Sequence, residues 1–351
     1  MRGRKRLSRT LGDVNTNEGM KKKLILCLFA ILLGTGSFGW YVYSTLTTPG
    51  PSHPQSIVVL IPQGVQLQTI VRRLVSEGVL TNGLVFSWWA RLTKADRKIK
   101  SGEYEFIEPL SPLELLRRLT QGESRRFVVT IPEGKTLQEI AAILAAKGLG
   151  TEESFLCLNT DPVFLDRWGL PHQGMEGYLF PDTYYLSRFA TAEEILGKMI
   201  ERFYRIFTPA LYRQADRLHM SPHEVVTLAS LVEKETGAAS ERPFVSAVFH
   251  NRLKKGMLLQ CDPTVIYGIE NFDGNLTRLH LQTPTPYNTY IFPGLPPGPI
   301  ASPGLHSILA TLNPADRPYL YFVAKGDGTH EFSSDLASHN RAVQQFQKRR
   351  S

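Results

Sequence analysis

An uncharged apolar run at residues 24–42 constrains this chain more than any other feature of its sequence. The run is long enough to cross a bilayer as a helix, and Trp40, Tyr41 and Tyr43 stand where an interfacial aromatic belt would lie. A cleaved signal peptide is the alternative, but no convincing small-x-small cleavage pattern follows the run. Cys27 lies too early in the run to be a lipoprotein cysteine. We therefore predict an uncleaved, single-pass transmembrane helix at 24–43.

Positive charge is concentrated ahead of this run. The chain has a formal net charge of +8, and residues 1–23 contribute eight basic and two acidic side chains to it, so only +2 remains for everything else. A basic block before a membrane span keeps the amino terminus in the cytoplasm. We expect a protein of the cytoplasmic (inner) membrane whose folded part lies on the periplasmic, extracytoplasmic side. No basic stripe interleaved with aromatic residues stands out in the body of the chain, so we predict no nucleic-acid partner.

The 351 residues provide enough chain for about two domains beyond the span. Residues 58–70 resemble residues 128–140, and each copy reads as a strand, a Pro-x-Gly turn and an amphipathic helix. Residues 101–106 alternate like a short strand between the two copies. A strand–helix–helix–strand unit of this size resembles a LysM-type glycan-binding module. The alternative is a small α+β packing domain that only positions its neighbour.

The predicted fold class is α+β, with a single transmembrane helix, a LysM-like α+β subdomain and a mixed α/β catalytic domain. Prolines between the span and the first domain predict an extended tether, so this domain should lie close to the bilayer. The predicted parts are a basic cytoplasmic arm at 1–23, the transmembrane helix at 24–43, a linker at 44–56, the LysM-like repeat region at 57–160 and the catalytic domain at 161–348.

The clearest helix signature in the chain lies at residues 221–237. Ser221 and Glu224 predict a capping box, and Gly237 is expected to supply the left-handed residue that ends the helix. At about 100° per residue, the apolar side chains of this helix fall on one face. That face consists of Val225, Leu228, Leu231 and Val232.

Two acids near the end of this helix differ in their surroundings. Glu235 lies within about 20° of Leu228, in the middle of the apolar face, whereas Glu233 points about 140° away, towards the polar side. A carboxyl group on a buried face loses hydration, so its pKa should rise, as a general acid for glycoside cleavage requires. The structural alternative is an acid that a nearby arginine or water satisfies. We expect Glu233 to be a solvated helix acid, with tuning of Glu235 as its alternative role.

The segment 259–303 has little regular pattern and is rich in Gly, Pro, Asn and Thr. Long irregular segments inside a compact domain are usually functional or disordered, and parts of this one are too apolar and aromatic for disorder. We expect cleft walls dense in amide, hydroxyl and phenol groups, suited to a polyhydroxylated substrate. The candidates for binding sugar are Gln260, Tyr287, Asn288 and Tyr290.

The three cysteines and nine histidines form no recognisable metal or disulfide framework. Cys157 and Cys261 lie outside the span and could pair, and two free buried thiols are the alternative. The histidines are scattered without ligand spacing, so surface or structural roles are expected for them. We predict neither a metal nor a cofactor.

Six ordered motifs resemble those of the YceG-like family of endolytic murein (peptidoglycan) transglycosylases, and the resemblance covers nearly the whole chain outside the first 23 residues. It implies that the catalytic glutamate is the second acid of a Glu-Lys-Glu-Thr motif, which is Glu235 here, in agreement with the helical-wheel argument. It also implies a single-span anchor in the cytoplasmic membrane, a LysM-like subdomain and an external catalytic domain. The chain departs from the commoner pattern at Cys261, where the family often has Thr or Ser. The six motifs lie at 176–183, 229–236, 260–268, 283–290, 294–302 and 319–340.

The activity implied is that of a lytic transglycosylase, a carbon–oxygen lyase that acts on polysaccharides. We expect cleavage of the β-1,4 bond between N-acetylmuramic acid and N-acetylglucosamine in peptidoglycan glycan strands, with 1,6-anhydro ends as products. Glu235 would act first as acid and then as base. Such cleavage would terminate the elongation of nascent strands. Besides the glycan and the lipid bilayer, wall synthases (penicillin-binding proteins) are candidate partners.

Two alternatives stay open. A two-carboxylate muramidase would hydrolyse the same bond with Glu235 and a second acid, for which Asp182 and Asp262 are the candidates. A membrane-anchored glycan-binding scaffold of the wall-synthesis machinery would need no catalytic acid.

Overall fold

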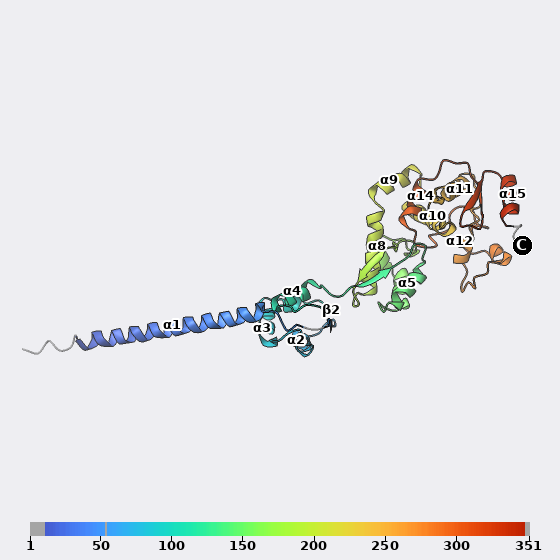
Figure 1. The fold of residues 1–351 in the computed structure, drawn as a ribbon. Helices are drawn as coiled ribbons and strands as arrows, with labels where there is room; N and C mark the ends of the chain where they lie inside the picture. The colour runs from blue at the N-terminus through green and yellow to red at the C-terminus, as the bar shows by residue number, and fades with distance from the viewer. Residues whose placement is uncertain (1–10, 53–54, 348–351) are drawn as a thin grey trace, which may run out of the picture. The chain divides into compact units, whose positions relative to one another are not determined.

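The structure, a computed structural model, describes residues 11–52 and 55–347 (Figure 1). Residues 1–10 of the predicted basic arm lie outside the described residues, and only the backbone is described for residues 11–22. The chain forms two compact units that divide between Arg125 and Arg126.

A long helix, α1 (Leu11–Thr47), opens the described chain. Its stretch Lys23–Thr47 is long and apolar enough to cross a membrane, and the most apolar part of this stretch is not covered by the rest of the protein. The helix continues past the predicted end at residue 43. Over this last turn, the hydroxyl groups of Ser44, Thr45 and Thr47 donate to backbone carbonyls of the preceding turn. The tether to the first domain therefore begins after Thr47.

In the first unit, helices pack on a two-stranded antiparallel sheet. Strand β1 (Ile57–Ile61) pairs with β2 (Gly102–Phe106), and the helices α2 (Leu67–Ser76) and α3 (Gly83–Leu92) lie between them in sequence. Helix α4 (Pro112–Gln121) follows β2. The strand–helix–helix–strand order predicted from the sequence is therefore observed. The largest side chains of its core are Phe86, Tyr104, Phe106, Leu74, Leu115 and Leu119.

The second copy of the repeat belongs to the second unit. Its strand β3 (Phe127–Thr130) pairs antiparallel with β4 (Thr183–Leu186), not with the first copy. Its helix α5 (Leu137–Ala146) buries Ile140 and Leu144 in the large core of the second unit. The division after Arg125 thus differs from the predicted repeat region at 57–160, because strand pairing and burial join the second copy to the second unit.

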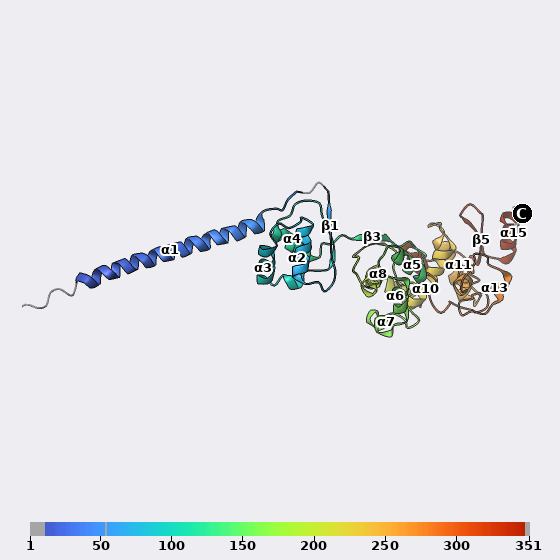
Figure 2. The same cartoon turned by 90° about the horizontal axis from the view of Figure 1, so that it is seen from below.

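Helix α10 (Pro222–Glu235) lies in the middle of the second unit, in contact with α11 (Arg242–Lys254) and α14 (Leu305–Leu312) (Figures 1 and 2). All eight residues from Val225 to Val232 are buried, so the helix is enclosed on every side. A helix buried all round is a core element, which fixes the positions of the residues at its end. The helices α6 (Glu152–Leu156), α7 (Pro162–Trp168), α8 (Ala192–Ile206) and α9 (Pro209–Arg217) precede it in the chain.

The C-terminal part of the chain supplies shorter elements. The segment 259–303, for which the sequence predicts little regular structure, contains the short helices α12 (Asp262–Tyr267) and α13 (Arg278–Gln282). Strands β5 (Tyr321–Ala324) and β6 (His330–Ser333) form an antiparallel hairpin. Helix α15 (Leu336–Phe346) packs against this hairpin.

Candidate active site

The last turn of α10 carries Glu235. At the other end of the helix, the predicted capping box is present: the Glu224 amide donates to Ser221 Oγ at 3.2 Å, and the Ser221 amide donates to Glu224 Oε2 at 2.7 Å. The C-terminal end differs from the prediction, because Thr236 is extended (φ −142°, ψ 131°) and Gly237 does not have a positive φ. Thr236 Oγ1 accepts a backbone amide two residues further on at 3.0 Å. The chain therefore leaves the helix without a left-handed glycine.

Glu235 lines the wall of a cleft and is only partly exposed. Burial raises the pKa of Glu235 to about 7, and the charge of Asp262 adds to the rise. A hydrogen bond from the Cys261 thiol and the charges of His330 and Arg252 oppose it. A carboxyl group with such a pKa is protonated in a large fraction of molecules at neutral pH, which suits a general acid. The desolvation predicted from the helical wheel is thus observed.

The cleft has a volume of about 360 Å³ and is formed by segments far apart in the sequence. Its walls come from the end of α10, from α11, from the turn before α12, and from the β5–β6 hairpin with α15. Asp262 is the only other acid that lines this cleft within residues 11–52 and 55–347. The polar side chains around it are those of Glu235, Arg252, Gln260, Asp262, Tyr290, His330, His339 and Gln347.

Three of the residues predicted from the sequence come together beside Glu235. Gln260 precedes α12 in a left-handed conformation (φ 50°), and its backbone N–H donates to the backbone carbonyl of Thr289 at 3.1 Å. The hydroxyl of Tyr290 donates to Asp262 Oδ1 at 2.5 Å. Gln260, Asp262 and Tyr290 therefore form one polar wall that faces the acid.

Three basic side chains, those of Arg252, His330 and His339, line the same cleft, and hydrogen bonds hold the first two in place. Arg252 Nε donates to Leu320 O at 2.7 Å and Nη1 donates to Leu259 O at 2.8 Å, which ties α11 to the hairpin and to the turn before α12. His330 Nδ1 lies 2.7 Å from Glu241 Oε2. The sequence offered no signal for His330, because it reaches the cleft only through the pairing of β6 with β5.

Tyr287 and Asn288 do not line the cleft, although the sequence predicts both as sugar-binding residues. Asn288 is completely buried, and its Nδ2 donates to Thr283 O at 2.8 Å. Its Oδ1 accepts the Tyr290 amide at 2.9 Å. The ring of Tyr287 packs on that of Tyr267, with the centroids 4.8 Å apart. Asn288 thus stabilises the loop that carries Tyr290, and Tyr287 packs on the last residue of α12.

The expectation that Glu233 is a solvated acid is wrong. Its side chain is only 6% exposed, and its Oε1 lies 3.0 Å from Nη2 of Arg242, which is itself 9% exposed. Its Oε2 accepts the Gly304 amide at 3.0 Å and the Ser307 hydroxyl at 2.7 Å. The polar side of α10 faces other helices of the unit and not water, so Glu233 joins α10, α11 and α14. This explains why the wheel position alone misjudged it.

Asp182 does not line the cleft either. It lies next to β4, and its Oδ2 accepts Nε of Arg202 at 2.6 Å. Its backbone carbonyl accepts the amide of Ile131 at 2.9 Å, which extends the pairing of β3 with β4. Of the two candidates for a second acid, only Asp262 shares the cleft with Glu235.

Glu176 is a second carboxyl group with an unusual environment, and the sequence analysis did not single it out. Burial raises the pKa of Glu176 to about 7. Its carboxylate accepts the Leu137 amide at 3.1 Å and the Tyr267 hydroxyl at 3.2 Å. Tyr267 ends α12, and Asp262 begins it, so Glu176 supports the helix that carries Asp262. The available signal was the pair of acids within the aromatic stretch 175–186.

The cysteines are free thiols, which answers the question of a pair between Cys157 and Cys261. Cys157 is exposed, whereas Cys261 is fully buried against Glu235. Within the described residues, no three side chains of His, Cys, Asp or Glu gather where they could hold a metal ion.

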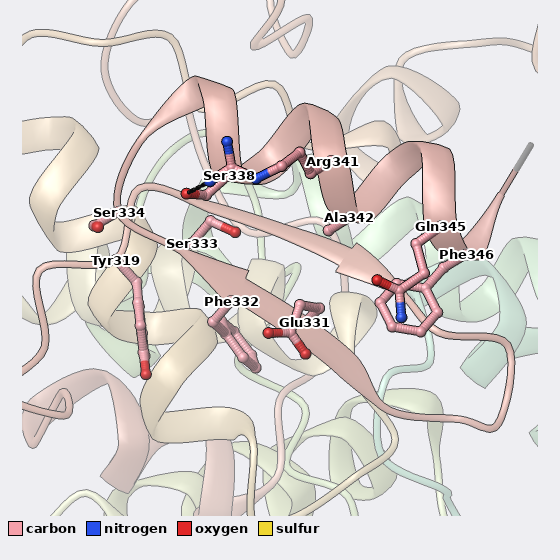
Figure 3. A pocket seen from close by; sticks show the side chains of 10 residues that line it. All are labelled: Tyr319, Glu331, Phe332, Ser333, Ser334, Ser338, Arg341, Ala342, Gln345 and Phe346. Carbon is pink, nitrogen blue, oxygen red and sulfur yellow. Dashed lines mark hydrogen bonds between the residues drawn. The ribbon is translucent and has the colours of Figure 1, made fainter.

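A second pocket is lined by residues of β6 and α15 and shares no residue with the cleft (Figure 3). Glu331 of β6 and Arg341 of α15 lie on its wall together with aromatic side chains. Of the β6 residues, His330 lines the cleft, whereas Glu331, Phe332 and Ser333 line the second pocket. Glu331 is therefore an acid that is adjacent in sequence to the cleft residue His330 but lies outside the cleft.

Comparison with known proteins extends these observations. The sequence pattern of the YceG-like family matches residues 59–345. The chain belongs to the YceG-like family. A protein named endolytic murein transglycosylase from Streptococcus pneumoniae serotype 2 (strain D39 / NCTC 7466) is 30% identical over an alignment of 351 positions. The alignment covers 91% of this chain and 63% of that protein. A protein of the same name from Bacillus subtilis (strain 168) is 30% identical over 308 residues, covering 83% of this chain and 85% of that protein.

A solved structure agrees with this assignment. The crystal structure of a yceG-like protein from Listeria monocytogenes superposes with a TM-score of 0.58 at 30% identity, covering 82% of this chain and 99% of that one. The α+β architecture of this YceG-like chain is therefore shared with an experimentally determined member. The chain spans less than two thirds of the length of the pneumococcal relative.

Proposed function

We propose that this YceG-like protein is an endolytic lytic transglycosylase that cleaves the β-1,4 bond between N-acetylmuramic acid and N-acetylglucosamine in peptidoglycan. The observation that carries the proposal is the position of Glu235, a carboxyl group with a pKa raised to about 7 in the wall of a polar cleft. The names of the relatives from S. pneumoniae and B. subtilis support the same substrate.

In the proposed reaction, neutral Glu235 donates its proton to the glycosidic oxygen as the bond to the muramyl anomeric carbon breaks. The resulting carboxylate then takes the proton of the muramyl 6-hydroxyl, whose oxygen attacks the same anomeric carbon. A 1,6-anhydro end forms, no water is consumed, and Glu235 regains its proton. One carboxyl group serves both steps because the nucleophile belongs to the substrate and is already positioned.

Charged and hydrogen-bonding groups around Glu235 suit this sequence of steps. Arg252 and His330 can stabilise the carboxylate that forms after the first proton transfer, since both lower the pKa of Glu235. Gln260 and Tyr290, which face the cleft, are the proposed sugar-binding residues. No other residue is needed as a nucleophile.

The substitution Glu235→Gln tests the role of the acid. It keeps the shape of the side chain and removes its ionisable group, so we expect the rate of glycan-strand cleavage to fall by about 100-fold or more. The rate is measured by chromatography of digested strands. The control is Glu331→Gln, which removes an acid that is 48% exposed in the separate pocket and should leave the rate unchanged. Digestion by Glu235→Gln at the parental rate would refute the assignment.

A two-carboxylate muramidase is the alternative that a specific observation favours. Asp262 lines the same cleft as Glu235, and a hydrolase needs a second carboxylate to activate water or to act as nucleophile. The hydrogen bond that Asp262 accepts from Tyr290 at 2.5 Å engages one of its oxygens, which favours a supporting role for this acid. The two mechanisms give different products, since only hydrolysis leaves reducing ends.

We further propose that α1 anchors the chain in the cytoplasmic membrane, with its amino terminus in the cytoplasm and both folded units outside. The apolar stretch Lys23–Thr47 and the eight basic residues at 1–23 support this orientation. Cleavage close to the membrane would act on nascent strands and terminate their elongation. Wall synthases stay a predicted class of partner.

A further inference from the structure

Helix α3 exposes apolar side chains on its outer face. Leu84, Trp88 and Leu92 are 85%, 50% and 59% exposed, and they recur at every fourth residue, so they form one stripe. The other face of the helix is buried through Phe86 and Ala90. Surface helices normally present polar residues to water, so an exposed apolar stripe of this kind marks an interaction surface.

The stripe begins beside the end of α1. Asn82, the N-cap residue of α3, donates from Nδ2 to the hydroxyl of Tyr41 at 3.2 Å. Val42 and Leu46 of α1 are buried, 9% and 4% exposed, so α1 is packed into the first unit and not merely tethered to it. Both views draw α3 at the end of the first unit nearest α1 and the β1–β2 sheet at the far end (Figures 1 and 2).

Helix geometry sets the depth at which α3 begins. At about 1.5 Å per residue, a hydrocarbon core about 30 Å thick accommodates about 20 residues. A span that starts after Lys23 therefore emerges close to Tyr41, within the aromatic group that also contains Trp40 and Tyr43. The Tyr41–Asn82 hydrogen bond then holds the start of α3 at the level of the lipid headgroups.

Basic side chains follow the apolar stripe. Arg91, Lys94, Arg97 and Lys98 are all exposed, and Asp96 is the one acid among them. Apolar and aromatic residues beside a cluster of Lys and Arg are typical of helices that lie in the interface of an anionic membrane. A protein partner would not need to lie at this depth, so the position next to α1 favours lipid.

We propose that α3 docks in the headgroup region of the membrane that α1 spans, with Leu84, Trp88 and Leu92 towards the acyl chains. The basic residues at 91–98 bind anionic lipid headgroups. The inference rests on the proposed anchoring by α1. Its consequence is that the first unit is held against the bilayer surface in one orientation.

Site-directed spin labelling of the full chain in vesicles tests the proposal. Leu84→Cys and Leu92→Cys are each labelled with a nitroxide in a background in which the exposed Cys27 and Cys157 are replaced by Ser, while the buried Cys261 stays unreactive. The vesicles contain phosphatidylglycerol and phosphatidylethanolamine. Collision with a water-soluble nickel chelate and with oxygen, which partitions into the bilayer, reports the depth of each label.

The matched control is Val58→Cys, an exposed apolar position (41%) on β1 at the far end of the same unit. We expect nickel collisions at positions 84 and 92 to be about fivefold or more rarer than at 58, with oxygen collisions more frequent. Equal nickel accessibility at all three positions would overturn the proposal. So would spectral broadening by labels at these positions on a second chain, since it would mean that a second copy covers the stripe.

Two further arms separate lipid docking from anchoring and from simple apolar contact. A label at Leu32→Cys, 68% exposed in the middle of the span, reports anchoring alone. If it is shielded from nickel while 84 and 92 are not, anchoring stands and docking fails; if it is accessible, anchoring itself fails.

Protection at 84 and 92 should weaken in vesicles of phosphatidylcholine alone, or with Arg91→Gln, Lys94→Gln and Arg97→Gln together. Protection unchanged in both cases would refute the role of the basic residues.

Discussion

Glu235 is surrounded by groups that move its pKa in opposite directions. Burial and Asp262 raise it to about 7, whereas Cys261, His330 and Arg252 oppose the rise. This balance suits a residue that must first donate a proton and later accept one, because neither form is strongly favoured at neutral pH. The acid form is needed first, so kcat/KM should fall as the pH rises past about 7.

At this scale, Asp262→Asn should shift the pH dependence. Removing a negative charge that raises the pKa of Glu235 lowers that pKa, so the alkaline limb of kcat/KM should move to lower pH by roughly half a unit to one unit. The profile is measured on glycan strands of defined length. The control, Tyr290→Phe, removes the hydroxyl that binds Asp262 but keeps its charge, and should leave the limb nearly in place.

A shift of the limb to higher pH in Asp262→Asn would contradict this account of the charge. Loss of nearly all turnover, with an unshifted limb in the residual activity, would instead favour Asp262 as the second carboxylate of a hydrolase.

At the scale of elements, the end of α10 is fixed by contacts from three directions. Glu233 joins it to α11 through Arg242 and to the start of α14 through Gly304 and Ser307. On another side, Lys234 Nζ donates to Gly134 O at 3.3 Å in the Pro-x-Gly turn of the second repeat copy. The second copy of the repeat thus contributes to the second unit by supporting the helix that carries Glu235.

Glu233→Ala should therefore destabilise the second unit. It leaves the guanidinium of Arg242 buried without its nearest carboxylate, which costs about 3 kcal/mol of unfolding free energy. Urea denaturation of the detergent-solubilised chain, followed by circular dichroism, measures the change. The neighbouring Lys234→Ala, at an exposed position, should cost less than about 1 kcal/mol. Equal costs for both variants would mean that the buried ion pair contributes no special stability.

The sequence predicted elements better than contacts between them. The capping box of Ser221 and Glu224 and the apolar face that holds Glu235 depend on local spacing, and both were predicted correctly. The burial of Glu233 and the approach of His330 depend on helices and strands far away in the chain, which local periodicity does not encode. For the same reason, the sequence did not reveal that Asn288 supports the loop of Tyr290, or that only Tyr290 of the two lines the cleft.

At the scale of the whole molecule, the chain combines an apolar helix, a small α+β unit packed on its end, and a larger unit with the cleft. The apparent repeat in the sequence is divided between the two units, so similar strand–turn–helix segments serve different purposes. The first copy builds the unit next to α1, and the second supports α10. The proposed docking of α3 would hold the first unit on the membrane.

The measurement that tests the central claim most directly is digestion of purified glycan strands in oxygen-18 water, followed by mass spectrometry of the new ends. If the muramyl 6-hydroxyl is the nucleophile, the parent protein should produce 1,6-anhydro ends that carry no oxygen-18. Reducing ends with one oxygen-18 atom each would show that water attacks the anomeric carbon, and would contradict the proposed role of Glu235 as the single acid and base.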